Sequence, residues 1–250
     1  VVAEARGGKH VTGVRLRGHG ASLRDGIDAL ACDLLVMSGG WNPVIHLYAQ
    51  SRGKPRWCEE RACFVPDAAA QPQSSAGAAN GDFSLQAALV GGVQAGLRAV
   101  QGAAPTRPAD LPDWSTHSVE VTPLLPLWSV GKGKDATRGS KQFIDYQNDV
   151  SVSDILLAVS EGYHSVEHVK RYTAMGFGTD QGKLGNINGM GVLAEALKQS
   201  IPATGTTTFR PNYTPVSFGA MAGRELGDWF DPIRRTCLHD WNLEQGAIFE

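Results

Sequence analysis

Hydrophobic and polar positions follow different periods along this chain of 250 residues, and the periods predict its elements. Residues 1–5 and 11–16 cluster β-branched side chains around the turn residues 7–10, which predicts an antiparallel hairpin. Residues 32–38 form a compact apolar run that stops at Gly39, as a buried parallel strand does before a ligand-facing loop. We therefore expect a buried strand of an α/β domain here.

Leucine and valine recur at a near-helical spacing between Phe83 and Val100, after a Gly/Ala-rich stretch at residues 72–82. A Gly-rich loop that opens a helix is therefore predicted. Gly91 and Gly92 lie inside the helical pattern, where each costs about 1 kcal/mol relative to alanine. We expect these two glycines to permit close packing, as against a strand.

Five prolines interrupt residues 104–140, which predicts an extended connection between domains. Helical patterning then returns three times, over residues 154–160, 165–175 and 188–199, and predicts one small helical domain. The first of these helices is expected to begin with a capping box of Ser151 and Asp154. Residues 201–250 have strand-like, proline-broken pieces without a clear period.

The composition and charge of the chain argue against several classes of partner. Hydrophobic residues make up 42% of the chain, and 23 basic against 25 acidic residues leave a net charge of −2, which disfavours nucleic acid or an anionic membrane as partner. No apolar run approaches the roughly 20 residues that span a bilayer. Four cysteines without a C-x-x-C pair suggest a reducing, cytoplasmic location. Because the first residue is valine, we expect the chain to be part of something longer.

Five segments carry a family resemblance: Cys32–Pro43, Ser51–Lys54, Phe143–Val150, Ser165–Thr173 and Gly205–Pro211. Together they closely resemble the alpha subunit of heterotetrameric sarcosine oxidase, and the resemblance spans nearly the whole chain. The large subunit of N-methylglutamate dehydrogenase is a close alternative.

This resemblance implies an α/β fold class: the C-terminal part of a two-dinucleotide-binding-domain flavoprotein-like fold, plus a small helical ferredoxin-like domain without a cluster. Residues 1–103 would be part of the NAD-binding domain, 104–140 the linker and 141–200 the helical domain. Residues 201–250 would lead into a folate-binding aminomethyltransferase-like domain, whose beginning Arg235–Trp241 resembles.

The resemblance also implies an activity for the whole complex. It would oxidise sarcosine to glycine at FAD in another subunit, pass electrons to FMN between the alpha and beta subunits, and reduce oxygen to hydrogen peroxide. Tetrahydrofolate would leave as 5,10-methylenetetrahydrofolate from the downstream domain. The implied partners are the beta, gamma and delta subunits, the alpha subunit would hold NAD, and no catalytic residue is expected in this chain.

The resemblance places Ala78 where related FAD enzymes have an aspartate that binds the ribityl chain of the flavin. A methyl group cannot accept that hydrogen bond, and NAD has no ribityl chain, so NAD contacts are expected at Ala78, Phe83 and Leu85. Asp82 could restore a carboxylate if the loop shifts register. An FAD-binding amine or opine oxidase subunit therefore stays an alternative.

The helical domain resembles [2Fe-2S] modules of related oxidases, in which four cysteines hold the cluster. Asp145, Gln147, Asp180 and Gly185 occupy the four positions here. Because none of these residues supplies a thiolate, we expect no iron–sulfur cluster.

The loop that contains Thr179, Gln181 and Lys183 offers backbone N–H groups, a hydroxyl and a cation, which together suit a phosphate. We expect it to face the FMN phosphate, with a solvated turn as the alternative. Tyr213 matches a family tyrosine that touches folate, and Arg210 could bind glutamate carboxylates.

Other chemistry has little support. His164 and His168 have metal-like spacing but lack both the glutamate of H-E-x-x-H and a third nearby ligand, so no metal site is expected. No serine lies in G-x-S-x-G. A structural scaffold with a vestigial nucleotide pocket remains the alternative from another class of function.

Overall fold

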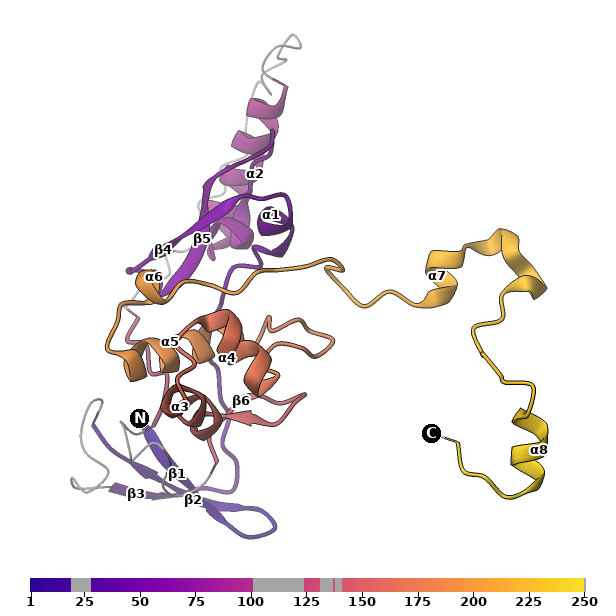
Figure 1. Ribbon diagram of the computed structural model, residues 1–250. Coiled ribbons are helices and arrows are strands. Elements are labelled where there is room, and N and C mark those ends of the chain that lie inside the picture. The colour runs from indigo at the N-terminus through magenta and orange to yellow at the C-terminus, as the bar shows by residue number, and fades with distance from the viewer. Residues whose placement is uncertain (19–27, 101–123, 131–136, 138–140, 250) are drawn as a thin grey trace. The chain divides into compact units, whose positions relative to one another are not determined.

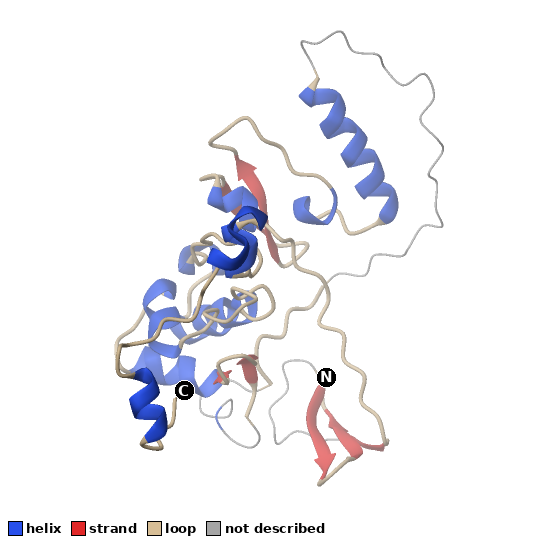
Figure 2. Cartoon of the chain, turned by 90° about the vertical axis from the view of Figure 1, so that its right-hand side faces the viewer, coloured by secondary structure: helices blue, strands red, loops and turns tan. Residues whose placement is uncertain are grey.

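The computed structural model describes residues 1–18, 28–100, 124–130, 137 and 141–249. These residues divide into two compact units, residues 1–213 and 214–250. Figure 1 follows the chain through its elements, and Figure 2 separates helices from strands.

Three antiparallel strands open the first unit: β1 (Val2–Gly7), β2 (Val11–Leu16) and β3 (Asp28–Ala31), paired in that order. The predicted hairpin is therefore confirmed. Its turn depends on Gly7, whose φ of 138° belongs to glycine and where a Cβ would lie 1.9 Å from the carbonyl oxygen of His10.

The strand predicted for residues 32–38 is wrong, because the structure has extended chain there and no ladder partner among the described residues. The side chains of Leu34, Val36 and Met37 are 71%, 80% and 79% exposed. An apolar run becomes a buried strand only where neighbouring strands and a covering layer are present. The described residues contain antiparallel pairs alone and supply neither.

A hairpin and a long helix follow. Helix α1 (His46–Gln50) precedes β4 (Lys54–Cys58) and β5 (Cys63–Ala68), and the short η1 (Gly77–Asn80) leads into α2 (Leu85–Ala99). The helix predicted over residues 83–100 is thus confirmed, with the Ser84 hydroxyl accepting from the amide of Ala87 at its start. The expected close packing is not found at Gly92, where an added Cβ would meet no atom within 4 Å.

Most of the predicted linker at residues 104–140 lies outside the described residues. Within its described part, Trp128 packs against the hydrophobic core, and an added Cβ at Gly191 would lie 2.2 Å from its ring.

The three helices predicted within residues 141–200 are confirmed, and a two-stranded ladder precedes them. The elements of this region are β6 (Phe143–Asp145), β7 (Val150–Ser151), α3 (Val152–Ser160), α4 (Val166–Thr173) and α5 (Asn186–Leu197), and α6 (Ile201–Thr204) follows directly. The predicted capping box is confirmed, with the Ser151 amide donating to the Asp154 carboxylate at 2.8 Å. Helix α5 begins two residues earlier than its apolar pattern indicated.

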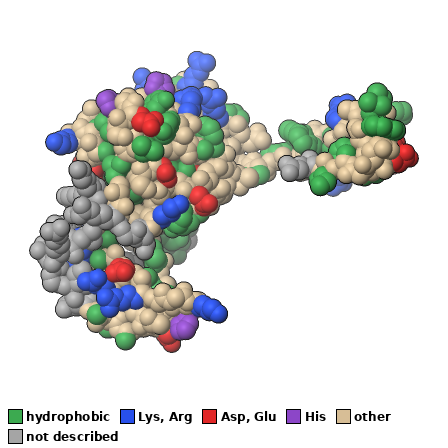
Figure 3. All heavy atoms as spheres, turned by 60° about the horizontal axis from the view of Figure 1, so that its bottom comes forward, with side chains coloured by type: hydrophobic (Ala, Val, Ile, Leu, Met, Phe, Trp, Pro, Cys, Tyr) green, Lys and Arg blue, Asp and Glu red, His purple; other side chains and the backbone are tan. Residues whose placement is uncertain are grey.

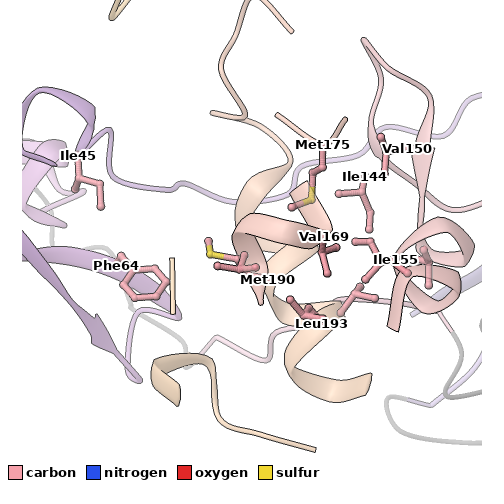
Figure 4. Close-up of a cluster of buried hydrophobic side chains, with 13 residues drawn as sticks. Ile45, Phe64, Ile144, Val150, Ile155, Val169, Met175, Met190 and Leu193 are labelled. Carbon is pink, nitrogen blue, oxygen red and sulfur yellow. The ribbon is translucent and has the colours of Figure 1, made fainter. Parts of the chain in front are cut away.

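The core of the first unit is centred on these helices. Ile155, Val169 and Leu193, from α3, α4 and α5, are each 0% exposed. Ile45 and Phe64, from the preceding region, belong to the same cluster of buried side chains (Figure 4). Residues on both sides of the predicted linker therefore share one core.

The second unit consists of short helices: α7 (Phe218–Ala222), η3 (Arg224–Trp229) and α8 (His239–Glu244). The strand-like interpretation of residues 201–250 is wrong, because no strand occurs in the described residues 201–249. Hydrophobic side chains lie on the surface of this unit (Figure 3), with Trp229 88% and Ile248 91% exposed.

Candidate functional site

The loop between α4 and α5 is held by side chains from the end of β6 and from the turn that follows it. The buried Asp145 carboxylate accepts hydrogen bonds from the backbone amides of Gln147 at 2.9 Å, Asn148 at 3.1 Å and Gly176 at 2.7 Å. The amide oxygen of Gln147 accepts from both the backbone and the hydroxyl of Thr179. Two residues thus fix the start of a loop about 30 positions further along the chain.

The same loop also holds the segment of residues 206–213, here called the strap. The side-chain amide of Gln181 donates a hydrogen bond to the backbone carbonyl oxygen of Asn212. The Lys183 ammonium donates one to the backbone carbonyl oxygen of Tyr213. The ammonium also lies 4.5 Å from the centre of the Tyr213 ring, a cation–π distance. The structure therefore brings two predicted FMN residues together with the predicted folate residue.

Asp180 shapes the tip of this loop. Its carboxylate accepts from the amides of Gly182 at 3.1 Å and Leu184 at 3.4 Å. The backbone of Gly182 has a φ of 74°, and an added Cβ there would lie 2.2 Å from the Asn186 side chain. Only glycine suits both the conformation and the close approach at this position.

The four positions that hold cluster cysteines in the related modules have a structural role in this chain. Asp145, Gln147 and Asp180 accept hydrogen bonds from loop amides. A Cβ at Gly185 would lie 2.3 Å from the carbonyl oxygen of Ile144, so a cysteine does not fit there without backbone movement. The residues present do not fit an iron–sulfur cluster.

His46, which the sequence analysis missed, is buried beside the strap. It is 3% exposed, and its ring centre lies 3.9 Å from that of Phe209. Burial, together with the nearby Lys183 cation, lowers the pKa of His46 to about 4, against smaller opposite effects of the Gln181 backbone and the Asp180 carboxylate. A single histidine in an apolar segment was the one available signal.

A small cavity of about 20 Å³ borders this histidine. Among the described residues, neither ring nitrogen of His46 has a hydrogen-bond partner in good geometry, and the same holds for Asn186 Oδ1 and Thr206 Oγ1. A space of this size and polarity suits one water molecule.

The predicted NAD residues lie elsewhere in the first unit, at η1 and the start of α2. Ala78 is exposed, and the side chains of Phe83 and Leu85 are 39% and 64% exposed. The Asp82 carboxylate accepts from Asn80 at 3.1 Å and pairs with Arg61 at 3.6 Å, so it is already engaged. The site residues therefore form two groups, one at η1 and α2 and one at the loop and strap.

Two further features bear on chemistry. The described ranges contain no group of three or more histidine, cysteine or acidic side chains placed to hold a metal ion. Among the same residues, none of the helices has the length and apolar character that crossing a membrane requires.

Residues 139–224, which include the loop and the strap, match the sarcosine oxidase A3 domain family. The chain is 41% identical, over 255 aligned positions, to sarcosine oxidase subunit alpha of Rhizobium meliloti (strain 1021), and the match covers 100% of the chain and 24% of that relative. This chain is homologous to part of the sarcosine oxidase alpha subunit. The corresponding subunit of Corynebacterium sp. (strain P-1) is 44% identical over 87% of the chain and 23% of its own length.

The chain thus spans about a quarter of the length of its sarcosine oxidase relatives. Its fold is similar to that of L-proline dehydrogenase from P. horikoshii, with a TM-score of 0.59 over 88% of this chain and 44% of that one. At 18% identity this likeness concerns the fold alone. Of the predicted fold class, the mixed α/β character is confirmed, and the match to the A3 family includes helices α3 to α6.

Proposed function

We propose that this chain is the NAD-binding and FMN-contacting part of a sarcosine oxidase alpha subunit. The observation that carries this proposal is the 41% identity to that subunit along every part of the chain. The complex, with its beta, gamma and delta subunits in the cytoplasm, oxidises sarcosine to glycine with formation of hydrogen peroxide and 5,10-methylenetetrahydrofolate. The residues that oxidise the amine lie in another subunit.

For NAD, we propose contacts at Ala78, Phe83 and Leu85. Their exposure fits this role, because an exposed methyl group and two exposed apolar side chains are available to a ligand. The engagement of Asp82 by Arg61 and Asn80 supports NAD over FAD, since that carboxylate is not free for a ribityl chain. Residues 1–103 are accordingly assigned to a dinucleotide-binding domain.

For FMN, we propose that Thr179, Gln181 and Lys183 face the phosphate at the interface with the beta subunit. Lys183 and Gln181 each keep N–H groups beyond the one given to the strap, so a phosphate can be bound without breaking the loop. Tyr213, held by Lys183, would contact the folate of the downstream domain that residues 201–250 lead into. FMN, when bound there, supplies one-electron and two-electron transfer to oxygen.

The helical domain, residues 141–200, is proposed to be a ferredoxin-like module without its cluster. Its support is the set of hydrogen bonds that Asp145, Gln147 and Asp180 make in place of metal ligation, together with the lack of space at Gly185. Iron and acid-labile sulfide analysis of the assembled complex tests this proposal. Stoichiometric amounts of either would overturn it.

Ala78→Asp tests the NAD assignment in the full chain assembled with its partner subunits. A carboxylate beside a diphosphate should weaken NAD binding by about 1–3 kcal/mol, because like charges then face each other at partial burial. Ala70→Asp, an exposed position in a preceding loop, adds the same charge and should leave the NAD dissociation constant unchanged. Equal NAD affinity in the two variants would contradict the assignment.

Lys183→Ala and Thr179→Ala test the FMN assignment in the same complex. Removal of the cation should lower FMN retention or slow electron transfer from FAD to FMN, and Thr179→Ala should do less, because a charged hydrogen bond is worth about 1.5–3 kcal/mol and a neutral one about 1. Lys54→Ala, at an exposed strand position, is the control. Wild-type FMN content and transfer rates in both variants would make the loop a solvated turn.

The amine substrate is tested on the same preparation. Oxidation of sarcosine with release of hydrogen peroxide supports the proposed reaction. Preference for N-methylglutamate would assign the chain to the related dehydrogenase. Absence of nucleotide binding in titrations would leave a structural scaffold.

A further inference from the structure

A cavity of about 300 Å³ lies between helix α4, the loop that follows it and the strap, within the first unit. Six of its lining residues carry the argument: Glu167, Lys170, Arg171, Phe177, Phe209 and Arg210. Three of these side chains are cations and one is an anion. The nucleotide assignments above use none of the six.

The single carboxylate in this set is already engaged. Glu167 pairs with Arg171 at 3.1 Å and accepts from the amide of Thr208 at 2.7 Å. Burial alone would raise the pKa of Glu167, but the bonds from Thr208 and the nearby cations Lys170 and Arg171 outweigh it and hold this pKa below its usual value. Glu167 therefore stays ionised and balances one cation, Arg171.

One carboxylate cannot offset three cations, so the side chains around the cavity carry a net positive charge. Within the described residues neither Lys170 nor Arg210 forms an ion pair, and Lys170 instead lies 5.8 Å from the centre of the Phe177 ring. Burial lowers the pKa of Lys170, and the nearby cations Arg210 and Arg171 lower it further. The Glu167 carboxylate acts in the opposite direction but does not restore the usual pKa. Two like charges thus face one partly enclosed space.

Like charges gathered around one space repel each other, and an anion bound between them relieves that repulsion. We propose that this cavity binds a small dianion, with Lys170 and Arg210 as its two charged ligands. Gln181, assigned above to the FMN phosphate, also lines this cavity, but Lys170 and Arg210 belong to neither the NAD nor the FMN assignment, so the site goes beyond the proposed function.

The cavity favours a phosphate monoester over a bare ion. Its volume lies at the lower end of the range for small-molecule sites, and Phe177 and Phe209 give it an apolar wall beside the cations. A guanidinium and an ammonium together match the two charges of a phosphate monoester. A dicarboxylate carries the same total charge as a phosphate monoester. The experiment therefore compares these two classes of ligand.

The test is a calorimetric titration of the full chain with phenyl phosphate at low ionic strength, above neutral pH. Lys170→Met/Arg210→Met should weaken the dissociation constant at least tenfold. Lys54→Met/Arg98→Met, which removes two exposed cations outside the cavity, should bind as the wild type does. Inorganic phosphate should bind more weakly than phenyl phosphate, and glutarate serves as the dicarboxylate probe.

Two further measurements keep the test decisive if the double variant is unstable. Arg210 is exposed, so Arg210→Met alone should weaken binding without disturbing the core. In the wild type, phenyl phosphate should protect Lys170 from an amine-modifying reagent, as read by mass spectrometry. Equal affinity in cavity and control variants, or unprotected Lys170 at saturating ligand, would overturn the proposal. Tighter binding of glutarate would support the dianion site and assign it to a dicarboxylate.

Discussion

The helices between residues 152 and 197 bury their apolar side chains, whereas the short helices after Tyr213 expose theirs. Ile155, in α3, is 0% exposed, and Ile248, in the second unit, is 91% exposed. Helices α3, α4 and α5 have eight to twelve residues each and pack on one another. None of α7, η3 and α8 exceeds six residues. An apolar pattern makes a core only where several elements long enough to cover one another meet.

The strongest test of this comparison replaces one isoleucine in each unit. Ile155→Ala should lower the free energy of unfolding by about 2–5 kcal/mol, because it leaves a cavity in a packed core. Ile248→Ala removes the same atoms from an exposed position and should change it by less than about 0.5 kcal/mol. Urea unfolding of both variants measures the difference. Equal losses would mean that Ile248 is buried in solution.

A second prediction asks whether polar contacts matter as much as the core within the A3 domain. Asp145→Ala should cost about 2–4 kcal/mol, because it leaves three amides without their charged acceptor, one of them the buried amide of Gly176. Asn148→Ala, at the exposed neighbouring turn, should cost less than about 0.5 kcal/mol. Asp145→Asn, which keeps an acceptor oxygen, should fall between them in the same unfolding experiment.

A third and smaller effect should depend on pH. The pKa of His46 is about 4 in the folded state and near 6.5 in the unfolded chain, so the unfolded chain binds the proton more readily. Stability should therefore fall by about 1–3 kcal/mol as the pH drops from about 6.5 to about 4.

Other groups titrate over the same pH range, so the measured quantity is the difference between variants. His46→Leu should lose this part of the acid sensitivity, whereas His168→Leu, at an exposed position, should keep it. A wild-type pH profile in His46→Leu would show that the folded protein does not hold the His46 ring in its neutral form.

Local signals in the sequence predicted local structure well. The Ser151 and Asp154 capping box and the helix behind Ser84 depend on contacts within three or four residues, and both are confirmed. The strand expected at residues 32–38 depends on neighbouring strands, which one apolar run does not specify. The sequence therefore predicted features that depend on near neighbours more reliably than a strand that depends on distant partners.

The candidate site shows the same limit. Thr179, Gln181 and Lys183 stood out because they share one polar loop, whereas the contacts of Gln181 with Asn212 and of Lys183 with Tyr213 came only from the fold. Lys170 and Arg210 are 40 residues apart, and no spacing rule links a helix residue to a distant strap. Their meeting is a property of tertiary structure.

The bonds from Gln181 and Lys183 to the strap have a thermodynamic consequence. A ligand that takes over the two N–H groups now donated to Asn212 and Tyr213, rather than the remaining ones, competes with these carbonyl oxygens, so its binding and release of the strap are linked. Linkage is reciprocal. If such a ligand changes the equilibrium between bound and released strap by some factor, then release of the strap changes the affinity of the loop for that ligand by the same factor. A short peptide segment thereby becomes a means of communication between a bound small molecule and the rest of the polypeptide.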